Sequence, residues 1–317
     1  MQTRRLGREG PEISVVGYGA WEAGGNMWGP NESEQQVVGA VRAAIDVGMT
    51  WIDTAEVYGN GRSEELVGTA IAGRRAEVLV FTKVAPKEDG GGGSGLRPDE
   101  VRGAIRGSLR RLGTDHVDLY QVHWPDSTGV PIEDTWGAMA EIQDQGLARH
   151  IGLSNFDRSA IERCEAIRHV DSLQNELSLM HQDDRARLLP WLDEQGTGYL
   201  AYGPLGFGML TGAITRETRF HPSDWRGGSF PGMSDSSEIF APEARAGWLD
   251  KVDRMRPIAE RLGTSLSSLA LAWVIARRGM TAAIAGSRNA DHVRSNAEAG
   301  DVNLDADALA DLDEIFG

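Results

Sequence analysis

Four side chains able to hold or transfer a proton stand at, or just after, the ends of short apolar segments. Asp53 ends the segment TWID, Lys83 ends VLVFTK, His123 ends VDLYQVH, and Tyr58 follows Asp53 by five residues. Singly, each has an ordinary interpretation: Asp53 as a helix cap, Lys83 and His123 as strand ends that reach solvent, and Tyr58 as an amphipathic rim residue. Together they would supply a tunable proton donor, which the reduction of a carbonyl to an alcohol requires.

The segments that carry these residues belong to a repeating pattern. A short β-branched or apolar run, a polar turn and a longer amphipathic run recur along the chain, and several of the longer runs stop at a glycine, as helices often do. We expect strands over Ser14–Gly19, Thr50–Thr54, Val78–Lys83, Val117–His123, His150–Ser154, Leu173–Glu176, Gly198–Tyr202 and Thr281–Ala285. We expect helices over Glu34–Val47, Ser63–Ala72, Pro98–Leu112, Ile132–Gln145, Arg158–Ile167, Arg185–Glu194, Ser265–Arg278 and Ala290–Ala299.

Eight strand–helix units predict an α/β protein with a (β/α)8 TIM barrel. The alternative is a doubly wound sheet with a second domain, but no linker or composition shift divides the chain, so we expect one domain over residues 1–317. An N-terminal β-hairpin over Thr3–Ser14 would close the barrel bottom, and Leu304–Ile315 would form a final surface helix. A long insertion spans about residues 203–264, with a Gly/Ser-rich loop at Thr215–Ser237 and an extra helix near Ala244–Leu262. Loops of this kind build active sites at the barrel mouth.

Composition excludes several classes of partner. The chain carries 47 acidic and 32 basic side chains, a formal net charge of −15, so nucleic acid and anionic membrane surfaces would be repelled. Cys164 is the only cysteine in the sequence, which excludes an intrachain disulfide and fits a cytoplasmic setting. The longest apolar run, Leu269–Ala276, is too short to span a membrane. No histidine pair has metal-binding spacing, so we expect no metal.

One glycine motif is set aside. Gly90, Gly92 and Gly95 match the dinucleotide-binding pattern G-x-G-x-x-G. The run GGGGSG is of low complexity, lies several residues after the nearest expected strand and does not open directly into a helix. We therefore expect a flexible loop without chemistry there.

Motifs along nearly the whole chain resemble those of the aldo-keto reductase superfamily. They are DTAEVYGNGRSEELVG, FTKV, LYQVHWPD, GLSNF, LQNELS, AYGPLGFGMLTG and IAGSRNADHVRSN. The resemblance implies a TIM barrel that binds a nicotinamide dinucleotide in extended form without a Rossmann motif. It also implies that Tyr58 is the proton donor and that Asp53, Lys83 and His123 complete a catalytic tetrad. A phenol with a pKa near 10 is a reluctant acid. Lys83 would therefore supply a cation, Asp53 would hold that cation, and His123 would orient the substrate oxygen.

The resemblance further implies the residues that hold the cofactor. Ser154, Asn155 and Gln174 would hold the carboxamide and Tyr202 would stack on the nicotinamide, although helix caps, a strand-end amide and a core tyrosine are the structural alternatives. Arg288 suits a 2′-phosphate, which favours NADP(H) over NAD(H), with a solvated loop arginine as the alternative. The expected cofactor-binding set is Gly19, Ala20, Trp21, Ser154, Asn155, Gln174, Tyr202, Gly203, Leu205, Gly206, Gly208, Gly286, Ser287, Arg288, His292 and Asn296.

The substrate is less well defined by the sequence. Trp21, Trp28, Trp124 and Trp225 are expected on loops at the catalytic face and, with Tyr58, would form an apolar or aromatic-tolerant pocket. The insertion also carries arginines that would instead favour an anionic substrate, and both alternatives stay open. These arginines are Arg216, Arg219 and Arg226.

The sequence thus predicts an NADP-dependent reductase of aldehydes or ketones. Because potassium-channel β subunits share this barrel and cofactor site, the alternative is a nicotinamide-binding regulatory or partner-binding subunit, and steady turnover of a carbonyl substrate would separate the two. A barrel hydrolase or isomerase without a redox cofactor conflicts with the joint pattern of Ser154, Asn155, Gln174 and Tyr202. Physiological substrate, preferred direction and oligomeric state cannot be inferred from the sequence.

Overall fold

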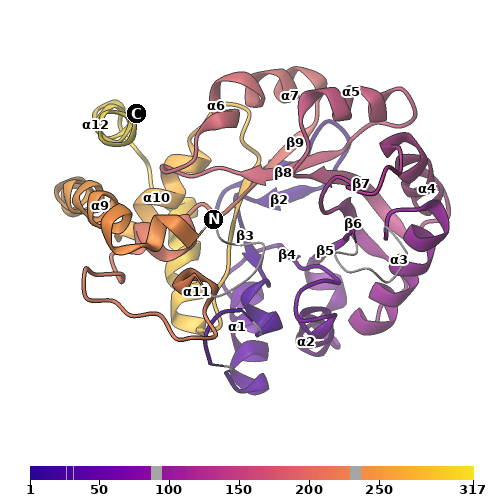
Figure 1. Cartoon of the computed structure of the whole chain (residues 1–317), viewed down its shortest axis with the longest axis horizontal. Coiled ribbons are helices and arrows are strands. Elements are labelled where there is room, and N and C mark those ends of the chain that lie inside the picture. Colours follow the sequence, from indigo (N-terminus) through magenta and orange to yellow (C-terminus); the bar gives the residue numbers. More distant parts are fainter. Residues whose placement is uncertain (26, 31, 87–94, 229–236) are drawn as a thin grey trace.

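Eight parallel strands close into a barrel in the computed structural model of the chain (Figure 1). Around the barrel the strands follow the order β10-β3-β4-β5-β6-β7-β8-β9, and β9 pairs with β10 to complete the ring. The structure describes residues 1–25, 27–30, 32–86, 95–228 and 237–317. Gly90 and Gly92 of the discounted motif, and residues 229–236 of the expected insertion loop, lie outside this part. The predicted (β/α)8 barrel is confirmed.

The strand and helix bounds follow the expected pattern closely. The strands are β1 (Thr3–Arg5), β2 (Glu12–Ser14), β3 (Val16–Gly19), β4 (Trp51–Asp53), β5 (Leu79–Val84), β6 (Val117–Val122), β7 (Ala148–Ser154), β8 (Ser172–Glu176), β9 (Gly198–Tyr202) and β10 (Ala282–Ala285). The helices are α1 (Glu34–Asp46), α2 (Arg62–Ile71), α3 (Pro98–Leu112), α4 (Ile132–Asp144), α5 (Arg158–Glu165), α6 (Asp183–Arg187), α7 (Leu189–Gln195), α9 (Pro242–Leu262), α10 (Leu266–Ile275), α11 (Ala290–Glu298) and α12 (Ala306–Phe316).

Two expected elements differ from the structure for local reasons. The strand expected over Ser14–Gly19 is divided, because Ser14 pairs with Thr3 in the hairpin and its hydroxyl donates to the carbonyl of Val16 at the corner. The helix expected over Arg185–Glu194 is two helices, α6 and α7. Pro190 stands at the start of α7, where its missing N–H cannot continue the preceding helical turn.

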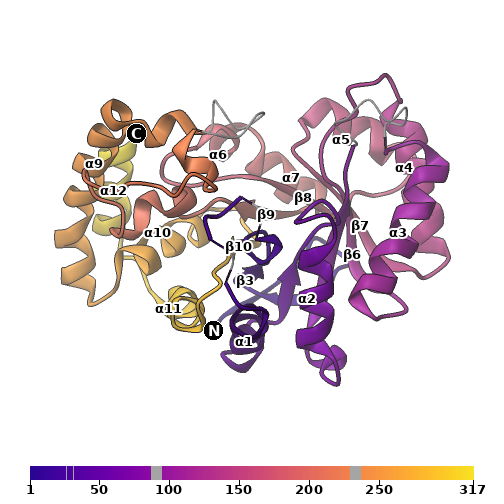
Figure 2. The same cartoon turned by 60° about the horizontal axis from the view of Figure 1, so that its bottom comes forward.

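The insertion after β9 forms short 3-10 segments and the long helix α9. The 3-10 segments are η3 (Gly206–Thr211), η4 (Trp225–Gly227) and η5 (Glu238–Phe240). In Figures 1 and 2, α9 and α12 lie together at one side of the barrel, apart from the ring formed by α1 to α7. No helix in the described residues is long and apolar enough to cross a bilayer.

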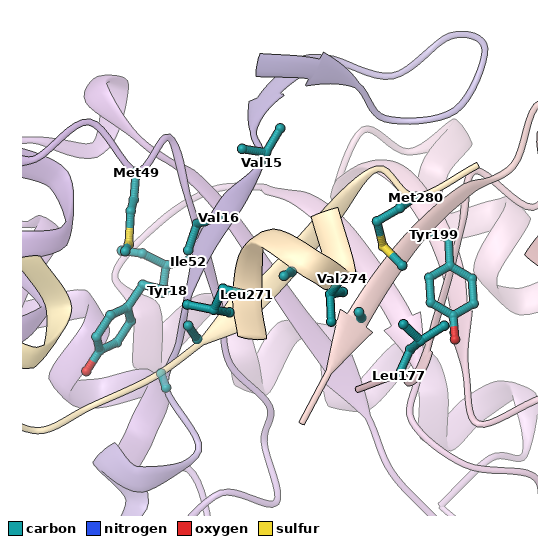
Figure 3. Close-up of a cluster of buried hydrophobic side chains, with 14 of the residues drawn as sticks. Val15, Val16, Tyr18, Met49, Ile52, Leu177, Tyr199, Leu271, Val274 and Met280 are labelled. Atoms are coloured by element: carbon teal, nitrogen blue, oxygen red, sulfur yellow. The ribbon is translucent and has the colours of Figure 1, made fainter. Parts of the chain in front are cut away.

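Two layers of buried apolar side chains stabilise the barrel. Between strands and helices, side chains such as Tyr18, Ile52 and Leu271 form a continuous core, part of which Figure 3 shows. Inside the barrel a smaller cluster joins the strands to the hairpin: Leu6, Ile13, Trp51, Phe81, Leu119, Leu200, Ala282 and Ile284. Leu6 and Ile13 come from the hairpin, which therefore closes the barrel bottom as predicted. Polar side chains are left to occupy the opposite end, at the strand C-termini.

Candidate active site

The alternation of side chains along the strands brings the predicted catalytic residues together. Residues two apart on a strand point the same way. Successive inward residues run from the apolar interior to a polar carboxyl end: Trp51 and Asp53 in β4, Phe81 and Lys83 in β5, and Leu119 and Gln121 in β6. His123 directly follows β6 and is 3% exposed, so it lies at the same end.

Lys83 carries a buried ammonium group with a complete set of acceptors. Its side chain has no exposed surface. Nζ donates to Asp53 Oδ1 at 2.5 Å, to the carbonyl of Thr54 at 2.9 Å and to the Tyr58 hydroxyl at 3.5 Å. An ammonium has three N–H donors, so each is used once. The Asp53 carboxylate compensates the charge of this ammonium.

Tyr58 lies between Lys83 and His123. Its hydroxyl is 3.5 Å from Lys83 Nζ and 3.5 Å from His123 Nε2. Two glycines allow this placement, because the Tyr58–Gly59 backbone packs directly on the turn at Gly24. A Cβ at Gly59, where φ is +61°, would lie 2.4 Å from the carbonyl oxygen of Gly24. The YG pair lies within the motif DTAEVYGNGRSEELVG, but its packing on Gly24 has no signal in the sequence.

The burial of the site sets the protonation of its groups. Burial raises the pKa of Tyr58 well above its usual value, and the Asp53 carboxylate adds to the rise, so the phenol holds its proton in the resting protein. Burial, and then the Lys83 ammonium, lower the pKa of His123 well below its usual range, so this imidazole is neutral. Burial also lowers the pKa of Lys83, while Asp53 and Glu64 oppose that shift. A protonated phenol next to a paired ammonium and a neutral imidazole is an arrangement suited to donating a proton.

Two glutamine amides reach Asp53 from other strands. Gln174 in β8 donates Nε2 to Asp53 Oδ2 at 2.9 Å, and Gln121 in β6 does so at 3.4 Å. Gln174 is expected at the cofactor carboxamide, and its amide nitrogen also donates to the Asp53 carboxylate. Gln121 was not expected at the site. It lies two residues from both Leu119 and His123, and this spacing indicates that its side chain points into the barrel as theirs do.

Both the nitrogen and the oxygen of the Asn155 side-chain amide form hydrogen bonds with neighbouring residues. Nδ2 donates to the carbonyl of His123 at 2.9 Å and to Ser154 Oγ at 3.2 Å, while Oδ1 accepts from the Tyr202 hydroxyl at 2.8 Å. Its φ of +65° is unusual for a residue other than glycine. Asn155 therefore fixes the outer end of Tyr202 and the strand end that carries His123.

The glycine-rich turn after β9 adopts conformations that require glycine. Gly203, Gly206 and Gly208 have φ values of +64°, +53° and +101°. At the ends of the neighbouring strands β10 and β3, a Cβ at Gly286 would lie 2.2 Å from the carbonyl oxygen of Gly19, so these two expected cofactor positions pack backbone to backbone. Leu205, between the first two glycines, is partly buried.

Arg288 is anchored on the loop that follows β3. Its guanidinium donates to the carbonyl of Trp28 at 2.7 Å and to that of Pro30 at 2.9 Å. The neighbouring Ser287 hydroxyl lies 3.3 Å from His292 Nδ1. Burial raises the pKa of Glu22, and the charges of Arg288 and Arg226 oppose that rise, so a carboxylate lies within reach of both guanidinium groups. Glu22 is not among the site residues expected from the sequence.

The expected tryptophans form one aromatic cluster, but they are not equally accessible. Trp124 is 38% exposed and stacks on His123 with ring centroids 3.6 Å apart. Trp21 lies 6.2 Å from the Tyr58 ring, and Trp225 stacks behind it at 6.0 Å. Trp225 has no exposed surface and Trp28 only 8%. Both were expected to line the pocket, and the structure instead places them behind Trp21, because the insertion folds back onto the β3 loop.

Comparisons with known proteins show the family of the chain. A profile of the aldo/keto reductase family matches residues 15–316. Aldo-keto reductase YhdN of Bacillus subtilis is 34% identical over 100% of this chain and 94% of that protein. A probable voltage-gated potassium channel subunit beta of Oryza sativa is 31% identical over 95% and 92%, and the NADH-specific methylglyoxal reductase of Escherichia coli is 29% identical over 96% and 95%. The chain belongs to the aldo/keto reductase family.

Solved structures of relatives share the whole fold. The glycerol dehydrogenase AKR11B4 from Gluconobacter oxydans superposes with a TM-score of 0.85 at 30% identity, covering 99% of this chain and 94% of that one. An aldo/keto reductase from Klebsiella pneumoniae, solved in complex with NADP and acetate, has a TM-score of 0.73 at 29% identity, covering 99% and 96%. The chain is thus similar along its length to oxidoreductases of this family.

The pKa shift of His123 can be measured directly. We expect its imidazole NMR signals to stay unchanged between about pH 5.5 and 8, where an ordinary histidine with a pKa near 6.5 titrates. His169, whose pKa is raised by its hydrogen bond to Glu165, is the internal control and should titrate. As the pH falls below about 6.5, the unfolded chain takes up the His123 proton before the native one, so this group lowers stability on acidification. A His123 midpoint at or above about 6.5 would contradict the electrostatics described here.

Proposed function

We propose that this protein is an NADP(H)-dependent carbonyl reductase in which Tyr58 gives a proton to the substrate oxygen. The observation that carries the proposal is the position of the Tyr58 hydroxyl, 3.5 Å from both Lys83 Nζ and His123 Nε2 at the carboxyl end of the barrel. Catalytic residues of TIM barrels lie at this end.

Each residue of the tetrad has a role that follows from its surroundings. Tyr58 starts protonated, because burial raises its pKa, and gives up its proton only as negative charge develops on the substrate oxygen. Lys83 then stabilises the phenolate that forms, and Asp53 keeps the ammonium charged within the barrel. Neutral His123 lies close enough to hydrogen-bond the same oxygen and so to orient the carbonyl towards Tyr58.

The residues around the mouth fit a nicotinamide dinucleotide. Gln174 keeps an amide oxygen for a carboxamide N–H, and the ring of Tyr202, anchored through Asn155, offers a face for stacking. The turn from Gly203 to Gly208, with three positive-φ glycines, is where the proposal places the pyrophosphate, because glycines let backbone approach a phosphate closely. When bound there, the dinucleotide would supply the hydride, while the chain positions the carbonyl and provides the proton.

NADP(H) is the proposed form of the cofactor. Arg288 places a guanidinium beside the last βα turn, and such a group binds a phosphate bidentately. The Klebsiella relative was solved with NADP, whereas the Escherichia coli relative is named as NADH-specific, so both dinucleotides are used by relatives of similar identity. The charge at residue 288 supports NADP(H) in this chain.

The aromatic mouth supports an apolar or aromatic carbonyl substrate rather than an anionic one. Trp124 and Val57 present 38% and 40% of their surfaces beside the tetrad. Two of the arginines that would favour an anion are already neutralised, since Arg216 pairs with Asp250 and Arg226 pairs with Asp224 at 2.6 Å.

A regulatory subunit is the second candidate. The identity to the Oryza sativa channel subunit is close to the identity to YhdN, so similarity alone does not separate the two roles. Sustained oxidation of NADPH with a panel of aldehydes, ketones and sugars would support the reductase. Cofactor binding with no turnover of any member would support the regulatory role.

Replacement of the proton donor gives the sharpest test of the reductase. Tyr58→Phe should bind NADPH as the wild type does but lose roughly 10²–10⁴ in turnover. Tyr120→Phe is the matched control, because the buried Tyr120 hydroxyl has no hydrogen-bond partner among the described residues. Steady-state kinetics with one good substrate would measure both variants. Retention of more than about a tenth of the turnover by Tyr58→Phe would show that another group donates the proton.

Replacement of Arg288 tests the choice of cofactor. Charge-assisted hydrogen bonds contribute roughly 1.5–3 kcal/mol, so Arg288→Ala should weaken NADPH binding by about 10- to 100-fold relative to NADH. Loss of its contacts to Trp28 and Pro30 would affect both cofactors, so the ratio of the two Kd values is the informative quantity. Fluorescence titration should show no change in that ratio for Arg294→Ala, which removes an exposed pair with Asp291. Equal affinity of the wild type for both cofactors would contradict the assignment.

A further inference from the structure

A pair of buried glutamine amides lies beside Asp53 of the tetrad. Gln121 has no exposed surface and Gln174 has 2%. Both come from inward positions, Gln121 in β6 and Gln174 in β8, and both donate to the same oxygen of Asp53. Gln174 Nε2 also lies 3.4 Å from Gln121 Oε1. The pair therefore connects two strands through the catalytic carboxylate.

The hydrogen-bonding capacity of these groups fixes how each amide is turned. A carboxylate paired with an ammonium only accepts hydrogen bonds, so both amide nitrogens must face Asp53. Gln121 then presents its Oε1 to Gln174 Nε2. The two N–H groups of Gln174 are thereby assigned, one to Asp53 and one to Gln121. The atom of the Gln174 amide left for a ligand is its oxygen.

We propose that Gln121 is a positioning residue that holds the Gln174 amide in this orientation, so that the site accepts an N–H group from the cofactor carboxamide. This inference rests on the proposed function. Without the Gln121 oxygen, one N–H of Gln174 loses its partner and the amide is free to tilt towards the mouth. The site would then discriminate less well between a ligand group that donates a hydrogen bond and one that only accepts a hydrogen bond.

The position of Gln121 is more polar than packing requires. The inward residue two places earlier, Leu119, is apolar, and a Cβ on neighbouring Gly152 would lie 3.3 Å from Gln121 Cγ. An apolar side chain of the same length would fill this space. A buried amide at such a position costs free energy unless its hydrogen bonds are made, which indicates that those bonds are used.

Two cofactors that differ in one group test the proposal. In 3-acetylpyridine adenine dinucleotide phosphate, a methyl ketone replaces the carboxamide, so the carbonyl remains and the N–H donor is lost. The wild type should bind it about tenfold more weakly than oxidised NADP, because the Gln174 oxygen loses its donor. Fluorescence titration gives both Kd values without any turnover.

The decisive quantity is the ratio of these Kd values in Gln121→Met. Methionine keeps the length and apolar volume of the side chain but removes both hydrogen bonds. The ratio should fall to about threefold or less, whereas a merely structural role would shift both Kd values together and leave the ratio unchanged. Gln145→Met, at an exposed position directly after α4, is the matched control and should keep the wild-type ratio.

Each outcome either supports or overturns the inference. A reduced ratio in Gln121→Met supports it, and an unchanged ratio in a variant with wild-type thermal unfolding overturns it. If Gln121→Met fails to fold, the same ratio is measured in Gln121→Leu, which also removes both hydrogen bonds, and equal affinity of the wild type for the two dinucleotides would overturn the inference in either case. Failure of the wild type to bind either dinucleotide would instead overturn the proposed function, and this inference with it.

Discussion

A positive charge with no access to water is the constraint on which the site depends. An ammonium inside a protein costs several kcal/mol unless a counter-charge and hydrogen bonds compensate it. Lys83 meets that requirement with one carboxylate, one carbonyl and one phenol, its full donor capacity. The carboxylate needs its own partners, and Gln121 and Gln174 provide them. One buried charge therefore links β4, β5, β6 and β8 at the end of the barrel where chemistry is expected.

The barrel supplies this arrangement through its layering. Below the tetrad, the side chains of Trp51 and Phe81 stack with ring centroids 5.0 Å apart, and the hairpin closes the bottom. The polar layer therefore packs on buried apolar side chains. Charge–charge interactions in such surroundings are stronger than in water. Backbone contacts without side chains, such as that between Gly24 and Gly59, let loops from separate strands approach closely. The same packing that stabilises the fold holds the phenol in position.

Much of this was predictable from the sequence because the relevant signals are local. A strand that ends in a polar residue marks the barrel mouth, and that rule located Asp53, Lys83 and His123. Gln121 could not be predicted as a site residue, because a single glutamine within an apolar strand does not indicate which residues of other strands it contacts inside the barrel. The burial of Trp225 was missed for a related reason, since it depends on how the insertion folds back onto the β3 loop. Contacts between distant segments are where sequence patterns carry least information.

In the proposed mechanism Lys83 acts through Tyr58, and a double-mutant cycle measures this coupling. Single-turnover rates with one carbonyl substrate and saturating cofactor would be compared for Tyr58→Phe, Lys83→Met and the double variant. If Lys83 serves only to stabilise the Tyr58 phenolate, the double variant should react within about threefold of Tyr58→Phe alone, because groups that act as a unit give strongly non-additive losses. Rate losses that multiply in the double variant would show that the two side chains act independently and would contradict the account.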